Sequence, residues 1–80
     1  MGQSMLDSMH RPMIETDGNR SVVITGKCAI VLYSKTEMRI QCGRLTVCVC
    51  GTELELQCLD ESEICICGLI MEISFLTGEG

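Results

Sequence analysis

The sequence has 80 residues, a formal net charge of −5 and no tryptophan, and Tyr33 and Phe75 are its aromatic residues. A chain of this length forms one domain that buries only roughly 60% of its unfolded surface, so its core is thin and support from a partner chain is expected. The acidic charge and the scattered placement of the six lysines and arginines argue against a nucleic-acid-binding protein.

The N-terminal residues indicate where the protein is located. Residues 1–11 lack the basic and apolar regions of a secretory signal, and no apolar run reaches the roughly 18 residues that a membrane crossing requires. We therefore expect a cytoplasmic protein without membrane insertion. The predicted organisation is a flexible segment at residues 1–11, one all-β domain at residues 12–76 and a tail at residues 77–80. His10, the only histidine, falls in the first segment, where an exposed polar role is expected.

From residue 13 onward, short segments of alternating hydrophobic and polar residues are separated by glycines or polar pairs, which is typical of strands and hairpins. Gly51-Thr52 is predicted as a two-residue link and Gly68 as a break between strands. The connections are too short for parallel pairs, which need a crossover of about a dozen residues. The predicted fold class is therefore all-β, an antiparallel meander of about seven or eight short strands that forms a small sandwich, roll or partly open barrel. The predicted strands span residues 13–16, 20–25, 28–34, 37–42, 44–50, 53–58, 63–67 and 69–76.

Alternation along the strands assigns their two faces. The residues predicted to point together toward the core in two of the strands are Met38, Ile40 and Cys42, and Leu54, Leu56 and Cys58. The four cysteines of two Cys-x-Cys pairs, Cys48, Cys50, Cys65 and Cys67, instead alternate with valine or isoleucine and so fall on the otherwise polar face. A second buried surface or a site is implied there.

The two Cys-x-Cys pairs have two interpretations. Four thiolates are the number that zinc or an iron-sulfur cluster takes. Residues i and i+2 of a strand, however, lie about 6.6 Å apart, whereas two sulfurs on one zinc lie roughly 3.8 Å apart. In a meander the strand at residues 53–58 would also separate the two pairs. We therefore expect reduced cysteines that act as small hydrophobic residues in a cytosol. A metal-binding or redox-responsive site at Cys48, Cys50, Cys65 and Cys67 is the alternative.

Catalytic chemistry has little support in the sequence. The folded part offers no base for a Cys-His pair, and the acidic run around residues 53–63 lacks the pattern of a calcium loop, so a solvated edge is expected. We predict no enzyme, no catalytic residue and no cofactor. A carbohydrate- or peptide-binding sheet is a third alternative, which the two aromatic residues disfavour.

The order of residues between positions 12 and 75 resembles a known family. The elements of the pattern are Pro12-Met13-Ile14, Gly18-Asn19-Arg20, Tyr33-Ser34, Glu37-Met38-Arg39-Ile40, Gly43-Arg44-Leu45, Val49, Gly51, Leu54, Leu56, Glu63-Ile64, Ile66, Gly68, Ile70, Ile73 and Phe75. In this order and spacing they resemble the YqfC/YabP family of sporulation proteins, and the YqfC branch in particular.

The resemblance implies a small all-β protein, made in the mother cell of an endospore-forming bacterium, that contributes to spore envelope or coat formation without known enzymatic activity. It implies other sporulation proteins as partners, among them the membrane protein YqfD, and a location in the mother-cell cytoplasm or at the forespore envelope. We also expect a homo-oligomer. The family pattern supplies no ligand residues and does not call for cysteine at positions 48, 50, 65 and 67. Residues 25–29 depart from the Glu-Asn-His-Lys-Gly-like stretch of the family.

Overall fold

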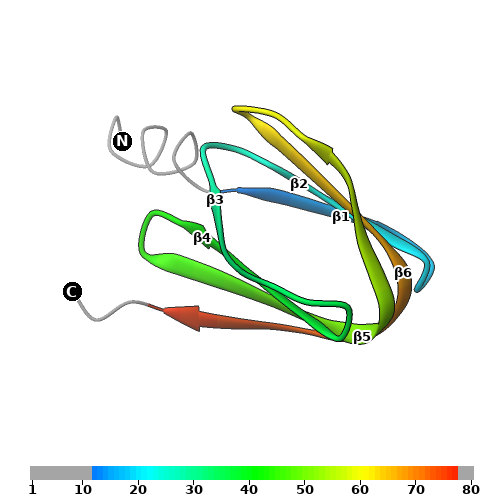
Figure 1. Cartoon of the computed structure of the whole chain (residues 1–80). Helices are drawn as coiled ribbons and strands as arrows, with labels where there is room; N and C mark the ends of the chain where they lie inside the picture. The colour runs from blue at the N-terminus through cyan, green and yellow to red at the C-terminus, as the bar shows by residue number, and fades with distance from the viewer. Residues whose placement is uncertain (1–11, 78–80) are drawn as a thin grey trace.

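The computed structural model describes residues 12–77, and within this range every regular element is a β-strand (Figure 1). All strand pairs are antiparallel, and one sheet contains the strands in the order β1-β2-β6-β5-β4-β3. The predicted all-β class is therefore confirmed. The strands are β1 (Met13–Asp17), β2 (Ser21–Thr25), β3 (Ala29–Tyr33), β4 (Glu37–Cys42), β5 (Leu45–Leu59) and β6 (Glu63–Thr77).

The segment at residues 1–11, His10 within it, and residues 78–80 of the predicted tail lie outside the described residues. Between residues 12 and 77 the structure has no helix of the length and apolarity that a bilayer crossing needs.

Two long strands replace four of the predicted short ones. The segments predicted at residues 44–50 and 53–58 are continuous in the 15-residue β5, and those at 63–67 and 69–76 are continuous in the 15-residue β6. Gly51-Thr52 is not a turn, because Gly51 pairs with Ile70 and Thr52 with Leu69 inside the β5–β6 ladder. The sheet thus has six strands instead of eight.

The β5–β6 ladder bends sharply where these glycines lie. A Cβ atom on Gly51 would overlap the carbonyl oxygen of Leu69, and a Cβ atom on Gly68 would lie 2.5 Å from the carbonyl oxygen of Glu53. Gly68 has φ 138° and Glu53 has φ 54°, both outside the extended region, so the chain changes direction here. Figure 1 shows β5 and β6 turning over together at this point, which folds the sheet onto itself.

The folded sheet has two layers. The first layer contains β1, β2, residues 63–67 of β6 and residues 55–59 of β5, and the second layer contains residues 70–77 of β6, residues 45–50 of β5, β4 and β3. Because β2 pairs with β6 and not with β3, the strand order differs from a simple meander, and the connection at Gly26 carries the chain from one layer to the other. The alternation pattern identifies strands but not their non-sequential partners, which explains this difference.

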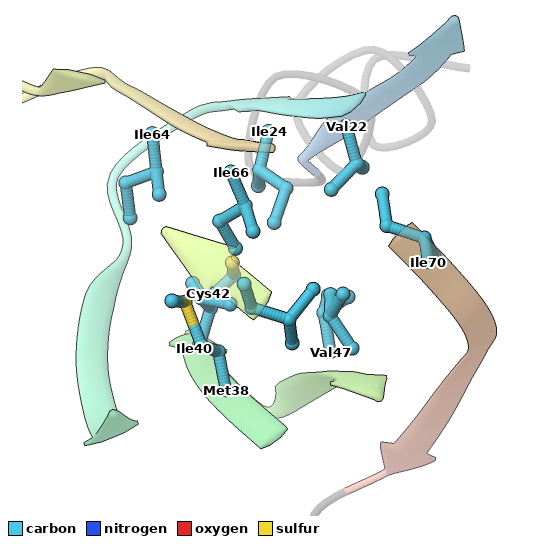
Figure 2. Close-up of a cluster of buried hydrophobic side chains, with 11 residues drawn as sticks. Val22, Ile24, Met38, Ile40, Cys42, Val47, Ile64, Ile66 and Ile70 are labelled. Carbon is cyan, nitrogen blue, oxygen red and sulfur yellow. The ribbon is translucent and has the colours of Figure 1, made fainter. Parts of the chain in front are cut away.

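The core lies between the two layers. In Figure 2, Val22, Ile24 and Ile66 of the first layer point toward Ile40 and Val47 of the second. The described residues include no buried polar or charged side chain. The complete buried cluster is Val22, Ile24, Met38, Ile40, Cys42, Val47, Val49, Leu54, Ile64, Ile66 and Ile70, with Leu56 packed against it. The inward-facing prediction is thus confirmed for Met38, Ile40, Cys42, Leu54 and Leu56.

Candidate functional site

Cys48 and Cys50 lie on the outer face of the second layer, opposite the side that packs in the core. Cys48 is 6% exposed and is flanked by Arg39 of β4 and Ser74 of β6. Cys50 is half-buried and is flanked by Glu37 and Glu72. Partial burial, followed by these two carboxylates, raises the pKa of the Cys50 thiol. The surroundings of Cys50 therefore favour the protonated thiol, whereas Cys48 is shielded from solvent by its burial.

Cys65 and Cys67 lie on the outer face of the first layer. The adjacent core residues Ile64 and Ile66 are fully buried, whereas both cysteines are half-buried. Cys67 is flanked by Ser21 of β2 and Glu55 of β5. The predicted position of the two Cys-x-Cys pairs, on the face away from the core, is therefore confirmed.

The structure does not bring the two pairs together. Cys50 lies opposite Glu72, and position 72 is five residues beyond Cys67 on β6. Five residues of a strand span roughly 16 Å, and the bend of the ladder lies between them. Among residues 12–77 there is no group of three or more histidine, cysteine or acidic side chains placed to hold a metal ion. The arrangement of Cys48, Cys50, Cys65 and Cys67 therefore does not provide the four-thiolate geometry of the alternative hypothesis.

Cys28 and Cys42 form a disulfide, which corrects the prediction that all the cysteines are reduced. Their Cα atoms are 4.3 Å apart, and the neighbouring pair Ala29 and Gln41 shows that the β3–β4 register places the two cysteines directly opposite each other. Opposed residues of antiparallel strands have Cα atoms about 4.5–5.5 Å apart, within reach of a disulfide. The sequence spacing alone did not reveal this pair, because the pair depends on the register.

Cys58 lies on a different face from the one predicted. Leu56 pairs with Ile66 on the core side, the register then shifts, and Cys58 pairs with Cys65 on the outer side. A β-bulge at this point adds one residue to β5 and so turns Cys58 to the opposite face. The alternation of residues 53–58 gave no sign of the bulge, and Cys58 therefore did not appear among the candidate site residues.

The Cys65 thiol lies next to one carboxylate and one further thiol. Its Sγ atom donates a hydrogen bond to Oε2 of Glu63 at 3.8 Å. Partial burial, followed by the Cys58 thiol and the Glu63 carboxylate, raises the pKa of Cys65. Cys65 is thus the member of the Cys-x-Cys pairs that faces a second thiol.

The edges of the two layers differ in chemistry. Within the described residues, β1 and residues 55–59 of β5 form the edges of the first layer, and acidic side chains at positions 15, 17 and 55 are exposed there. The second layer ends at β3 and at residues 71–77 of β6, where only Glu72 is charged. The second layer therefore has the more apolar edges.

Exposed hydrophobic side chains gather at these apolar edges. Val31 is 55% and Tyr33 is 58% exposed on β3, and Met71 is 69% exposed on β6. The other large exposed hydrophobic residues of the two segments are Leu32, Phe75 and Leu76. Natural sheets usually protect an edge strand with charges, proline, a bulge or a covering segment. The β3 edge has only a register irregularity between Ile30 and Leu32, and an apolar edge without charges marks a surface that can pair with another strand.

Most acidic side chains of the run at residues 53–63 are exposed. Glu53, Glu55, Asp60 and Glu61 are exposed, and the Asp60 backbone N–H donates to the Glu63 carbonyl at 2.8 Å to close the β5–β6 turn. The exposure of these acidic side chains agrees with the predicted solvated edge.

Comparison with known proteins identifies no relative, because no protein-family model, curated protein or solved structure matches this chain.

Proposed function

We propose that this chain is a non-catalytic assembly protein of the sporulation programme, which contributes to the spore envelope or coat by pairing its sheet edges with further copies of itself. The observation that carries the assembly part is the pair of bare apolar edges on the second layer. The sporulation part is supported by the resemblance of residues 12–75 to the YqfC/YabP family.

The β3 strand is the best candidate for one side of the contact. Its sequence, AIVLY, contains no charge and no proline, and only β4 pairs with it among the described residues. The opposite end of the sheet is different, because β1 follows Pro12 and carries Glu15 and Asp17. Like charges on directly paired strands are destabilising, so self-association through the acidic edges is disfavoured.

Strand direction allows the two apolar edges to pair with each other. The second layer has four strand segments in the order β6, β5, β4 and β3, and each is antiparallel to its neighbour. Since four is an even number, β3 runs opposite to β6 across the layer. The β3 edge of one copy can therefore pair with the β6 edge of the next in the antiparallel sense, without any rotation between the copies.

Such a contact is open-ended. Each added copy presents a new β3 edge, and heterologous contacts that do not close into a ring generate extended assemblies. The charges beside the edges are compatible, since Lys27 and Lys35 flank β3 and Glu72 lies on the β6 edge. An extended layer of this kind suits a protein of an envelope or coat.

The expected setting is the mother cell, at the forespore envelope, with other sporulation proteins as partners. The membrane protein YqfD is the companion that the resemblance implies, and it could anchor one end of such an assembly. The all-β fold agrees with the fold class that the resemblance implies.

A fluorescent fusion tests the biological part of the proposal. In a sporulating host, the wild-type fusion should collect around the forespore, because an assembled layer has many binding sites. A Val31→Lys fusion, with a charge on the β3 edge, should give weaker enrichment, while a Thr16→Lys fusion on the β1 edge should behave as the wild type. Diffuse wild-type fluorescence throughout sporulation would refute the proposal.

A further inference from the structure

We propose that Cys58 and Cys65 form a redox-active dithiol site, which is oxidised to a cross-strand disulfide by low-molecular-weight disulfides such as glutathione disulfide. This inference does not depend on the proposed function. It concerns one of the two outer faces where cysteines gather, and it uses a residue that lies outside the two Cys-x-Cys pairs.

The register of the β5–β6 ladder carries the inference. Cys58 and Cys65 are Cα partners in antiparallel strands, so their side chains project on the same face. Directly opposed residues have Cβ atoms about 4.5–5.5 Å apart, and a disulfide requires about 3.5–4.5 Å. A small adjustment is therefore sufficient, and the irregular ladder beside the bulge can supply it.

The same sheet already contains a disulfide of this type. Cys28 and Cys42 are also opposed residues of antiparallel neighbours, and they are bonded with a Cα separation of 4.3 Å. The other three free thiols lack such a partner in the register. Cys48 is opposite Arg39 and Ser74, Cys50 is opposite Glu37 and Glu72, and Cys67 is opposite Ser21 and Glu55. Cys58 and Cys65 are therefore the one opposed thiol pair among the free cysteines.

The pair is accessible to a small reagent. Both cysteines are half-buried, and they lie close to the exposed turn that contains Asp60 and Glu61. Within residues 12–77, no strand pairs with residues 55–59 of β5 on the side away from β6. Solvent can therefore reach the thiols from this edge, in contrast to the buried Cys48.

The reaction balances as a thiol–disulfide exchange. One thiol of the pair loses its proton, and the thiolate attacks a sulfur of the small disulfide. A mixed disulfide forms and one small thiolate leaves. The second cysteine, as a thiolate, then attacks the protein sulfur of the mixed disulfide and releases the other small thiol. The protein loses two electrons and two protons, and the small disulfide is reduced to two thiols.

The surroundings of Cys65 slow the steps in which Cys65 acts as the attacking thiolate. Partial burial, followed by the Cys58 thiol and the nearby Glu63 carboxylate, raises the pKa of Cys65 and favours its protonated form. The reactive species is the thiolate, so exchange should be slow at neutral pH and should accelerate by up to about tenfold per pH unit as the pH rises toward the thiol pKa.

The test uses the full chain, purified with its Cys28–Cys42 disulfide intact, and a series of glutathione/glutathione disulfide buffers. After each equilibration, remaining thiols are alkylated and counted by intact mass, and linked peptides are identified by mass spectrometry. In the oxidised wild type, two of the five free cysteines should be joined as a Cys58–Cys65 linkage, with no glutathione retained on either of them. The Cys67→Ser variant is the matched control, because Cys67 lies two residues along the same face, and it should show the same linkage.

The Cys65→Ser variant should lose this disulfide and instead hold one glutathione on Cys58, since no second thiol resolves the mixed disulfide. The proposal is overturned if the oxidised wild type retains glutathione on Cys58 or Cys65. It is equally overturned if Cys58 is linked to Cys50 or Cys67 as often as to Cys65, or if Cys58 still forms a disulfide with another protein thiol in the Cys65→Ser variant.

Discussion

The glycine at the bend of β5 should be indispensable for the two-layered fold. In a Gly51→Ala variant the new methyl group would overlap the Leu69 carbonyl oxygen and would lie 3.0 Å from the Leu69 carbonyl carbon and 3.1 Å from the Ile70 Cα. All three are backbone atoms of the paired strand, so no side chain can rotate away. The strands must separate at the point where the sheet folds over.

The size of the effect follows from two contributions. Overpacking costs about 1–3 kcal/mol, and each ladder hydrogen bond that is lost costs about 1 kcal/mol. We therefore expect a loss of about 3 kcal/mol or more, a large part of the total stability of roughly 4–12 kcal/mol for a domain of this length. With an m value of about 1 kcal/mol/M in urea, the unfolding midpoint should fall by about 3 M.

Gly43→Ala is the matched control. Gly43 lies in the β4–β5 turn with φ 66°, and a Cβ atom there would meet nothing within 4 Å. Its cost is limited to backbone conformation, about 1–2 kcal/mol. Urea unfolding followed by circular dichroism compares the two variants. If Gly51→Ala loses no more stability than Gly43→Ala, the close approach of the strands at the bend is not a determinant of the fold.

Two further predictions concern the cysteines. Removing the Cys28–Cys42 disulfide, which has a sequence separation of 14, should lower the free energy of unfolding by about 3 kcal/mol, because the closed loop no longer restricts the unfolded chain. Calorimetry checks this by comparing the wild type with a Cys28→Ser, Cys42→Ser variant. Unchanged melting temperatures would contradict the prediction. Stability should also decline in alkali, because a raised thiol pKa at Cys50 and Cys65 means that the native state holds the proton more tightly than the unfolded chain. The contribution is complete below the unfolded thiol pKa of about 8.5 and is lost as the pH rises through the higher folded value. The urea unfolding midpoint of the wild type should therefore fall as the pH is raised from 7 to 10, roughly the titration range of thiols. It should fall less in a Cys50→Ser, Cys65→Ser variant. If the midpoints of the two proteins fell equally with pH, the raised thiol pKa values would not be the cause.

Local patterns in the sequence predicted the strands and much of the core. Alternation placed Met38, Ile40 and Leu54 inward, and it placed Cys48 and Cys65 on the opposite face, because a half-buried strand has a period of two. The predicted connections at residues 17–19, 35–36 and 43 were also recognisable from their residues, and each joins adjacent antiparallel strands in the structure.

The features that differ from prediction depend on contacts between distant segments. Gly51 and Gly68 break the alternation in the sequence as a turn would, but in the fold they allow two backbones to approach each other in a continuous ladder. The pairing of β2 with β6, the Cys28–Cys42 disulfide and the position of Cys58 all follow from register, and a bulge changes register without an obvious signal in the sequence. The pairing of Cys28 with Cys42 and the face on which Cys58 lies therefore follow only from the three-dimensional structure.

Native mass spectrometry tests the central claim, assembly through the second layer, most directly. The wild type should appear as a series of multiples of the 8.8 kDa chain, with higher multiples at higher protein concentration, because the proposed contact is open-ended. Val31→Lys should shift the series to the monomer, and Thr16→Lys, on the β1 edge, should leave it unchanged. A wild type that stays monomeric at all concentrations, or a Val31→Lys variant with the wild-type series, would contradict the account.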